Sequence, residues 1–111
     1  MIFITGPLYS GKRDYACFLL NCGMEELGQR AVWNVQDLAA SRADLNALAD
    51  ELASHEVVIA TEVGGGVVPV DARERAAREA AGRLSCLLAR RAETVVRVFC
   101  GIPTVLKGEL P

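Results

Sequence analysis

The chain has 111 residues, of which 51% are hydrophobic and only 5% aromatic, and its formal net charge is −2. This length predicts a single domain over residues 1–111 with an aliphatic core, and the composition excludes a wholly disordered chain. The lack of basic charge argues against a nucleic-acid partner. No apolar run is long enough to span a membrane and no signal-peptide pattern is present, so we expect a soluble, cytoplasmic protein.

Three apolar runs in the first half predict strands, and helical periodicity between them predicts two helices. Gly23 and Gly28 are expected to bound a short turn. Ser41 is expected to cap the second helix, because its side-chain oxygen can accept a hydrogen bond from the first turn. The predicted elements are a strand over 2–5, a helix over about 11–22, a strand over 31–35, a helix over about 41–53 and a strand over 57–60.

A long helix is predicted after Asp71, which can cap it, with Glu74 completing a box-like start. A fourth strand is predicted over 95–99, and residues 100–111 are predicted to form turns with a loose end. Alternating strands and helices predict an α/β fold with a mainly parallel sheet of about four strands, covered on both faces. The first strand is expected between the third and fourth, with the second at an edge. Because so small a sheet leaves open edges, we expect a homo-oligomer.

The four cysteines and one histidine lack the close spacing of a zinc site. Cys17, Cys22, Cys86 and Cys100 are therefore interpreted as small buried apolar residues. His55 precedes the third strand, at the end opposite the expected phosphate site, and is interpreted as a surface residue.

Residues 6–13 match the pattern G-x-x-x-x-G-K directly after a strand and directly before a helix. Glycines in such a loop let several backbone N–H groups point at phosphate oxygens, and the helix presents its positive N-terminus there. Lys12 adds a point charge that can reach the β- and γ-phosphates. The predicted nucleotide-binding residues are Gly6, Pro7, Leu8, Tyr9, Ser10, Gly11, Lys12 and Arg13.

Arg13 departs from this pattern, because a serine or threonine normally stands there and offers its hydroxyl to Mg²⁺. An arginine does not ligate a cation, so it can instead form a salt bridge with Asp14, stack outward or donate to a phosphate. The expected Mg²⁺ site is therefore weakened or built from other residues.

Glu62 follows the third strand, at the edge of the sheet where α/β folds place their ligand chemistry. Its carboxylate can hold Mg²⁺ through water or act as a base toward a substrate hydroxyl, and Gly64–Gly66 can let backbone approach a ligand. Asp37 is a second candidate Mg²⁺ ligand, although it is also an ordinary helix cap. The arginines of the last helix, Arg78 among them, are interpreted as a solvated face or an interface.

Several segments resemble one known family, the adenosylcobinamide kinase/adenosylcobinamide-phosphate guanylyltransferases. Residues 59–69, IATEVGGGVVP, are similar to the family's NEVG-x-G-IVP signature, and residues 6–12 are similar to its phosphate loop. Gly82-Arg83-Leu84-Ser85 resembles its G-x-x-N helix segment. Residues 98–103, with Leu106-Lys107, resemble its closing strand and terminal lysine.

The resemblance implies a small three-layer P-loop (RecA-like) fold, GTP or ATP as phosphate donor, Mg²⁺, and phosphorylation of a cobinamide hydroxyl in cobalamin biosynthesis. It further implies a homotrimer, and it gives the catalytic positions to Lys12 and Glu62. The segment that carries the family's guanylate-accepting histidine has no counterpart before His55, so the guanylyltransferase step is expected to be lost. The two hypotheses are a cobinamide kinase, which is a phosphotransferase with an alcohol acceptor, and a catalytically degenerate nucleotide-binding sensor or accessory subunit.

Overall fold

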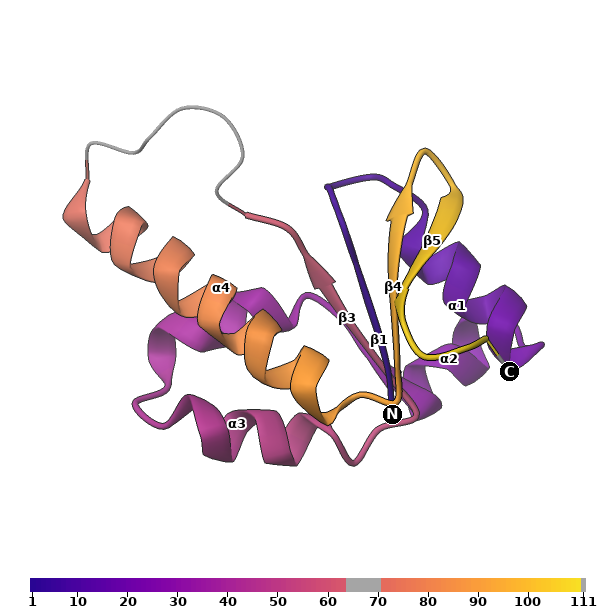
Figure 1. The fold of residues 1–111 in the computed structure, drawn as a ribbon, viewed down its shortest axis with the longest axis horizontal. Helices are drawn as coiled ribbons and strands as arrows, with labels where there is room; N and C mark the ends of the chain where they lie inside the picture. Colours follow the sequence, from indigo (N-terminus) through magenta and orange to yellow (C-terminus); the bar gives the residue numbers. More distant parts are fainter. Residues whose placement is uncertain (64–70, 111) are drawn as a thin grey trace.

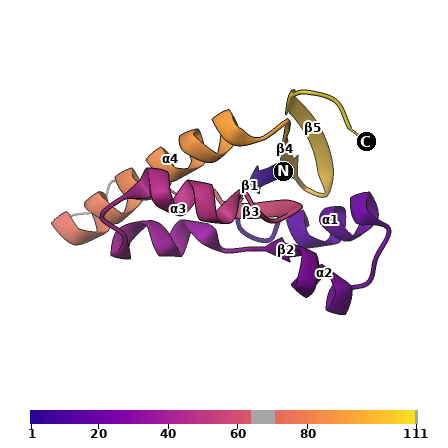
Figure 2. The same cartoon turned by 90° about the horizontal axis from the view of Figure 1, so that it is seen from below.

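A computed structural model of the protein describes residues 1–63 and 71–110. Its centre is a five-stranded sheet with helices on both faces, as Figures 1 and 2 show, which confirms the predicted α/β class. The predicted glycine loop over 64–66 lies outside the described residues. The strands are β1 (Ile2–Gly6), β2 (Ala31–Val32), β3 (Val57–Thr61), β4 (Thr94–Phe99) and β5 (Ile102–Lys107).

The strand order is β2-β3-β1-β4-β5, and the first four strands are parallel. The predicted central place of β1, between β3 and β4, is confirmed. Gly6 pairs with Thr61 of β3, and Thr5 pairs with Arg97 of β4. The carboxyl ends of these strands therefore meet at one edge of the sheet, the upper edge in Figure 1.

The fifth strand corrects the prediction that residues 100–111 form only turns. β5 pairs antiparallel with β4, with Phe99 opposite Ile102, so only Cys100 and Gly101 form the connection. Both residues have positive φ, 52° and 75°, as a two-residue hairpin turn requires. Pro103 argues against a strand in the sequence, but proline is tolerated on an edge strand, where β5 lies.

The helical elements differ from the prediction mainly between residues 24 and 44. The predicted turn after Gly23 is a helix, and the predicted strand over 31–35 ends at Val32. Asp44, not Ser41, caps the next helix, because its carboxylate accepts from the Ala47 N–H at 3.1 Å. The helical elements are α1 (Lys12–Leu20), α2 (Met24–Arg30), the 3-10 helix η1 (Val35–Ser41), α3 (Leu45–Leu52) and α4 (Ala72–Arg91).

Strand alternation divides the core into two layers. Phe3 and Val58 pack on the face covered by η1, α3 and α4. Ile4 and Ile59 pack on the opposite face with residues of α1 and α2. Both sets are nearly fully buried, at most 2% exposed. The predicted arrangement of three layers is therefore present: η1, α3 and α4 cover one face of the sheet, and α1 and α2 cover the other.

The start of α4 confirms the predicted cap, since Asp71 accepts a hydrogen bond from the Arg73 N–H at 2.7 Å. Two of the four cysteines contradict the prediction of burial: Cys86 and Cys100 are exposed, whereas Cys17 and Cys22 are half-buried. Among the described residues, no helix combines the length and the apolar character that a membrane span needs.

Candidate functional site

The loop between β1 and α1 takes a conformation that depends on glycine. Gly6 has φ of 154°, and a Cβ atom there would lie 2.2 Å from the Val98 carbonyl oxygen. Gly11 precedes α1 with φ of 88°, and the first helical hydrogen bond runs from the Tyr15 N–H to the Gly11 carbonyl. The N–H groups of the first turn, which begins at Lys12, are thus left for another acceptor.

Lys12 lies at the base of this loop and is only 7% exposed. Its ammonium donates to the Pro7 carbonyl at 2.6 Å and lies 3.5 Å from Ser10 Oγ. Burial lowers the pKa of Lys12, a nearby Glu62 charge partly restores that pKa, and Arg13 lowers it further. No carboxylate of the described residues forms an ion pair with Lys12. A buried ammonium without a carboxylate partner favours an anionic ligand.

The structure selects one of the three alternatives for Arg13. Its guanidinium carbon lies 5.6 Å from the centre of the Trp33 ring, so the side chain stacks on an aromatic face. No ion pair joins it to Asp14 or to another carboxylate of the described residues.

These residues surround a cavity of about 470 Å³, the loop cavity. Lys12, Arg13 and the side chain of Trp33 all contribute to its wall. Of the predicted nucleotide-binding residues, all but Gly6 and Pro7 line it. The full lining is Leu8, Tyr9, Ser10, Gly11, Lys12, Arg13, Asp14, Met24, Trp33, Asn34, Ile59 and Thr61.

Glu62 contacts the glycine-lysine loop of residues 6–13 through its backbone and β4 through its side chain. Its N–H donates to the Gly6 carbonyl at 2.8 Å. Its two carboxylate oxygens accept from Arg97 Nε at 3.1 and 3.0 Å, and the Arg97 guanidinium also lies over the Phe99 ring at 5.5 Å. Sequence reasoning missed Arg97, although an arginine inside the apolar strand VVRVF is a signal that could have found it.

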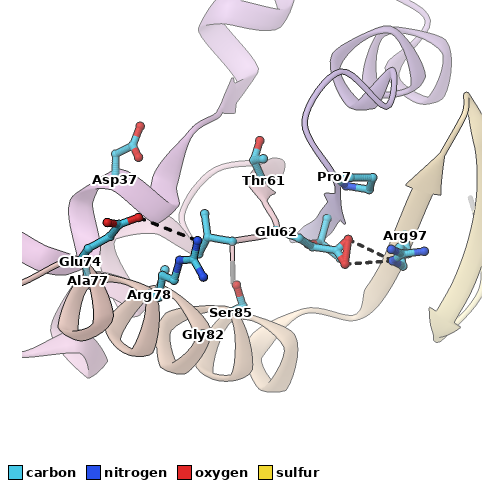
Figure 3. A pocket seen from close by; sticks show the side chains of 13 residues that line it. Pro7, Asp37, Thr61, Glu62, Glu74, Ala77, Arg78, Gly82, Ser85 and Arg97 are labelled. Carbon is cyan, nitrogen blue, oxygen red and sulfur yellow. Dashed lines mark hydrogen bonds and ion pairs between the residues drawn. The ribbon is translucent and has the colours of Figure 1, made fainter. Parts of the chain in front are cut away.

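Glu62 and Arg97 belong to a second and larger cavity of about 820 Å³, the α4 cavity, which Figure 3 shows. Small side chains on one face of α4 leave this space between the helix and the sheet. Arg78, predicted on a solvated face, lines it instead, 3.9 Å from Glu74. The full lining is Thr5, Pro7, Asp37, Thr61, Glu62, Val63, Glu74, Ala77, Arg78, Ala81, Gly82, Ser85 and Arg97.

Thr61 lines both cavities, so they meet at the end of β3. The two predicted catalytic residues therefore stand on neighbouring cavities, Lys12 in the loop cavity and Glu62 in the α4 cavity. His55 lines neither: it precedes the amino end of β3, where its Nδ1 contacts the Leu52 carbonyl at 3.0 Å.

The side chains present fit a Mg²⁺ ion poorly. This ion needs several oxygen ligands in octahedral geometry. Arg13 stands where a hydroxyl ligand is usual, Arg97 occupies both oxygens of Glu62, and Figure 3 shows Asp37 across the α4 cavity from Glu62. Within residues 1–63 and 71–110, no cluster of three or more His, Cys, Asp or Glu side chains can hold a metal ion.

The chain is thus an α/β protein in which parallel strands carry a glycine-lysine loop and an acidic residue at one edge of the sheet, the edge at which open α/β sheets commonly bind ligands. The family model "Cobinamide kinase / cobinamide phosphate guanyltransferase" matches residues 18–106. The chain belongs to this family, which acts in cobalamin biosynthesis with nucleotide substrates and is the one that the sequence resembles. The matched segment contains Glu62 and Arg97 and begins after the glycine-lysine loop of residues 6–13. No match was found among curated proteins.

Proposed function

We propose that this protein binds the phosphates of GTP or ATP in the loop cavity and phosphorylates a hydroxyl of cobinamide held in the α4 cavity. The observation that carries the proposal is the Lys12 side chain, which is 7% exposed and whose ammonium, among the described residues, meets only the oxygens of Pro7 and Ser10. A cation in such a place is stabilised when a polyphosphate enters. The same edge carries the start of α1, whose N–H groups and dipole favour the same ligand.

The proposed reaction is an in-line phosphoryl transfer. The acceptor hydroxyl oxygen forms a bond to the γ-phosphorus, the bond from that phosphorus to the β–γ bridging oxygen breaks, and the nucleoside diphosphate leaves. The hydroxyl proton passes to the Glu62 carboxylate. Lys12 and the N–H groups of the first turn of α1 stabilise the charge on the transferred group. Arg97 holds Glu62 at the border of the two cavities and acts as a positioning residue.

Guanylyl transfer through a histidine has no support in this geometry. His55 is the one histidine of the sequence, and it precedes the amino end of β3, opposite to the phosphate loop. We therefore propose that the kinase half of the family's chemistry is the half retained.

The RecA-like relationship and a homotrimer are parts of the same proposal. The exposed edge strand β5 supports self-association, because no strand within residues 1–63 and 71–110 pairs with its outer side, and Ile102 and Leu106 are 66% and 59% exposed.

A catalytically degenerate nucleotide-binding sensor or accessory subunit is the second candidate. Two observations favour it: Arg13 stands at the usual magnesium-ligand position, and Arg97 already occupies both oxygens of Glu62. Such a protein would bind nucleotide without consuming it.

The two candidates separate in calorimetric titration with GTP and ATP, followed by nucleotide consumption in the presence of cobinamide. Replacement of Lys12 with Met is expected to weaken nucleotide binding by about tenfold to a hundredfold, because one charge-assisted contact is lost. The melting temperature of this variant is expected to stay the same or rise, because the variant no longer buries the Lys12 charge. Lys107→Met, which removes the other lysine of the chain from a site on β5, is the matched control.

Equal affinity of the Lys12→Met variant and the unchanged protein would refute the phosphate site. Binding that depends on Lys12, with no nucleotide consumed when cobinamide is added, would support the accessory-subunit reading over the kinase.

A further inference from the structure

We propose that the Arg13 guanidinium replaces Mg²⁺ as the second cation on the phosphates of the bound nucleotide. This inference rests on the proposed function, because it concerns the same loop cavity. It gives the site a metal-independent mode of nucleotide binding, in which Lys12 and Arg13 together neutralise the polyphosphate.

The position of Arg13 supports this role. It is the second residue of α1, it directly follows Lys12, and both residues line the loop cavity. The N–H groups of the first helical turn lack helical acceptors and belong to the same end of the helix. A phosphate that accepts hydrogen bonds there lies within reach of a long side chain from the same turn. A guanidinium offers planar paired donors that match phosphate oxygens.

The charge of Arg13 is also available. Among the described residues it forms no ion pair, and its one aromatic partner is Trp33 at 5.6 Å. A cation–π contact between the exposed Arg13 and the half-buried Trp33 is weaker than a charge-assisted, two-donor contact with phosphate. The guanidinium is therefore expected to leave the Trp33 ring when a nucleotide enters.

The neighbouring carboxylates make a metal ion a poorer alternative. Arg97 occupies both oxygens of Glu62, and Asp37 stands across the α4 cavity. A metal ion on the phosphates would also lie close to the Arg13 charge, which repels it. An arginine at this position removes the hydroxyl that usually coordinates Mg²⁺. The same arginine supplies a positive charge in place of the metal ion.

Trp33 makes the proposal measurable, because it is the one tryptophan of the sequence. The experiment titrates the protein with GTP and with ATP, once with magnesium chloride and once with EDTA, and records tryptophan fluorescence together with calorimetric heat. For the unchanged protein, removal of magnesium is expected to change the dissociation constant by less than about threefold. Binding is expected to change the fluorescence, since Arg13 leaves the ring.

The Arg13→Ser variant is expected to lose affinity about tenfold in EDTA, or about 1.4 kcal/mol, and to regain part of it with magnesium. The Arg13→Lys variant keeps a positive charge, so its nucleotide affinity in EDTA is expected to lie between that of Arg13→Ser and that of the unchanged protein. Arg75→Ser removes an exposed arginine of α4 that lines neither cavity and is the matched control. Melting temperatures of all variants verify that each is folded.

The outcomes separate this inference from the function on which it rests. No binding to the unchanged protein, or binding that does not depend on Lys12, refutes the nucleotide site itself. Binding that depends on Lys12 but needs magnesium, with Arg13→Ser as tight as the unchanged protein in EDTA, refutes the role of Arg13 alone. If nucleotide binding changed the tryptophan fluorescence of Arg13→Ser as much as that of the unchanged protein, the change would not come from Arg13 leaving the Trp33 ring. That result would refute the proposed movement of the guanidinium.

Discussion

The loop cavity and the α4 cavity meet at Thr61 but differ in whether their cationic side chains have carboxylate partners. In the loop cavity, Lys12 and Arg13 have no carboxylate partner among the described residues. In the α4 cavity, Arg97 is paired with Glu62 at 3.0 Å, and Arg78 lies 3.9 Å from Glu74. The first cavity is therefore lined by two cations that form no ion pair with a described carboxylate, as the proposed polyphosphate site requires, whereas the cations that line the second lie beside carboxylates.

This difference follows from backbone geometry as much as from residue type. The loop cavity is built around the start of α1, where N–H groups already favour an anion. The α4 cavity is bounded by α4 from its first turn, at Glu74, to its middle, at Ser85, and its charged lining comes from side chains of the helix and the sheet. Unpaired cations beside unpaired N–H groups indicate a binding site, and paired charges indicate a surface that can orient a substrate.

The largest expected effect follows substitution of Gly6, which lines neither cavity but pairs in the sheet with Thr61, the residue that lines both. A Cβ atom in Gly6→Ala would lie 2.2 Å from the Val98 carbonyl, and φ of 154° is unfavourable for alanine. We expect a loss of about 3 kcal/mol or more in the free energy of unfolding, measured by urea denaturation. Because the Gly6 carbonyl also accepts from the Glu62 N–H, binding in both cavities should suffer.

Gly23→Ala is the control for this variant. No atom lies within 4 Å of a Cβ built at Gly23, which begins α2 with φ of −84°. Its cost should stay near 1 kcal/mol or below. If Gly6→Ala cost no more than Gly23→Ala, the close approach of β1 to β4 would not constrain the loop.

A smaller change in the free energy of unfolding, this time stabilising, is expected for substitution of Gly82 in the interior of α4. A Cβ atom there meets nothing within 4 Å, so Gly82→Ala should stabilise the helix by up to about 1 kcal/mol. Gly82 lines the α4 cavity, and the added methyl group narrows it. Cobinamide affinity should therefore fall while nucleotide affinity is unchanged, as measured by separate titrations.

Ala76→Gly is the reverse substitution on the exposed side of α4, away from both cavities. It should destabilise the protein by about as much as Gly82→Ala stabilises it and alter neither affinity. A loss of nucleotide affinity in Gly82→Ala would break the assignment of one ligand to each cavity.

The smallest expected effect is a pH shift in Glu62→Gln. Burial lowers the pKa of Lys12, and the Glu62 charge partly raises it again. Loss of that charge lowers the Lys12 pKa further, so the ammonium loses its proton at a lower pH. Nucleotide affinity falls as pH rises through the Lys12 pKa, and its alkaline limit should move toward lower pH in the variant.

Glu74→Gln is the control for the pH profile, because it removes an equal charge from the α4 cavity and does not influence the Lys12 pKa. Titration of nucleotide binding across neutral and alkaline pH measures both variants. Superimposable profiles for Glu62→Gln and the unchanged protein would mean that the two cavities are electrostatically independent.

Local patterns in the sequence were sufficient to place a glycine-lysine loop between β1 and α1, to give β1 its central position and to identify the cap at Asp71. Each depends on neighbouring residues: a glycine-lysine loop between a strand and a helix, an apolar run, or a carboxylate before a helical stripe. The family was also evident from short motifs, because those motifs are contiguous in the chain.

Two of the remaining features are also local, but the sequence patterns did not identify them. β5 follows β4 through the two-residue Cys100-Gly101 turn, and Asp44, not Ser41, caps α3 by accepting from the Ala47 N–H. The other features depend on contacts between distant residues. The Arg97–Glu62 pair joins residues 35 positions apart. Arg13 had three alternatives in the sequence, and tertiary packing chose Trp33. The sequence alone thus determined which residues are candidates for phosphate binding, while the tertiary structure decided which charges are paired, because pairing depends on side chains that only the fold brings together.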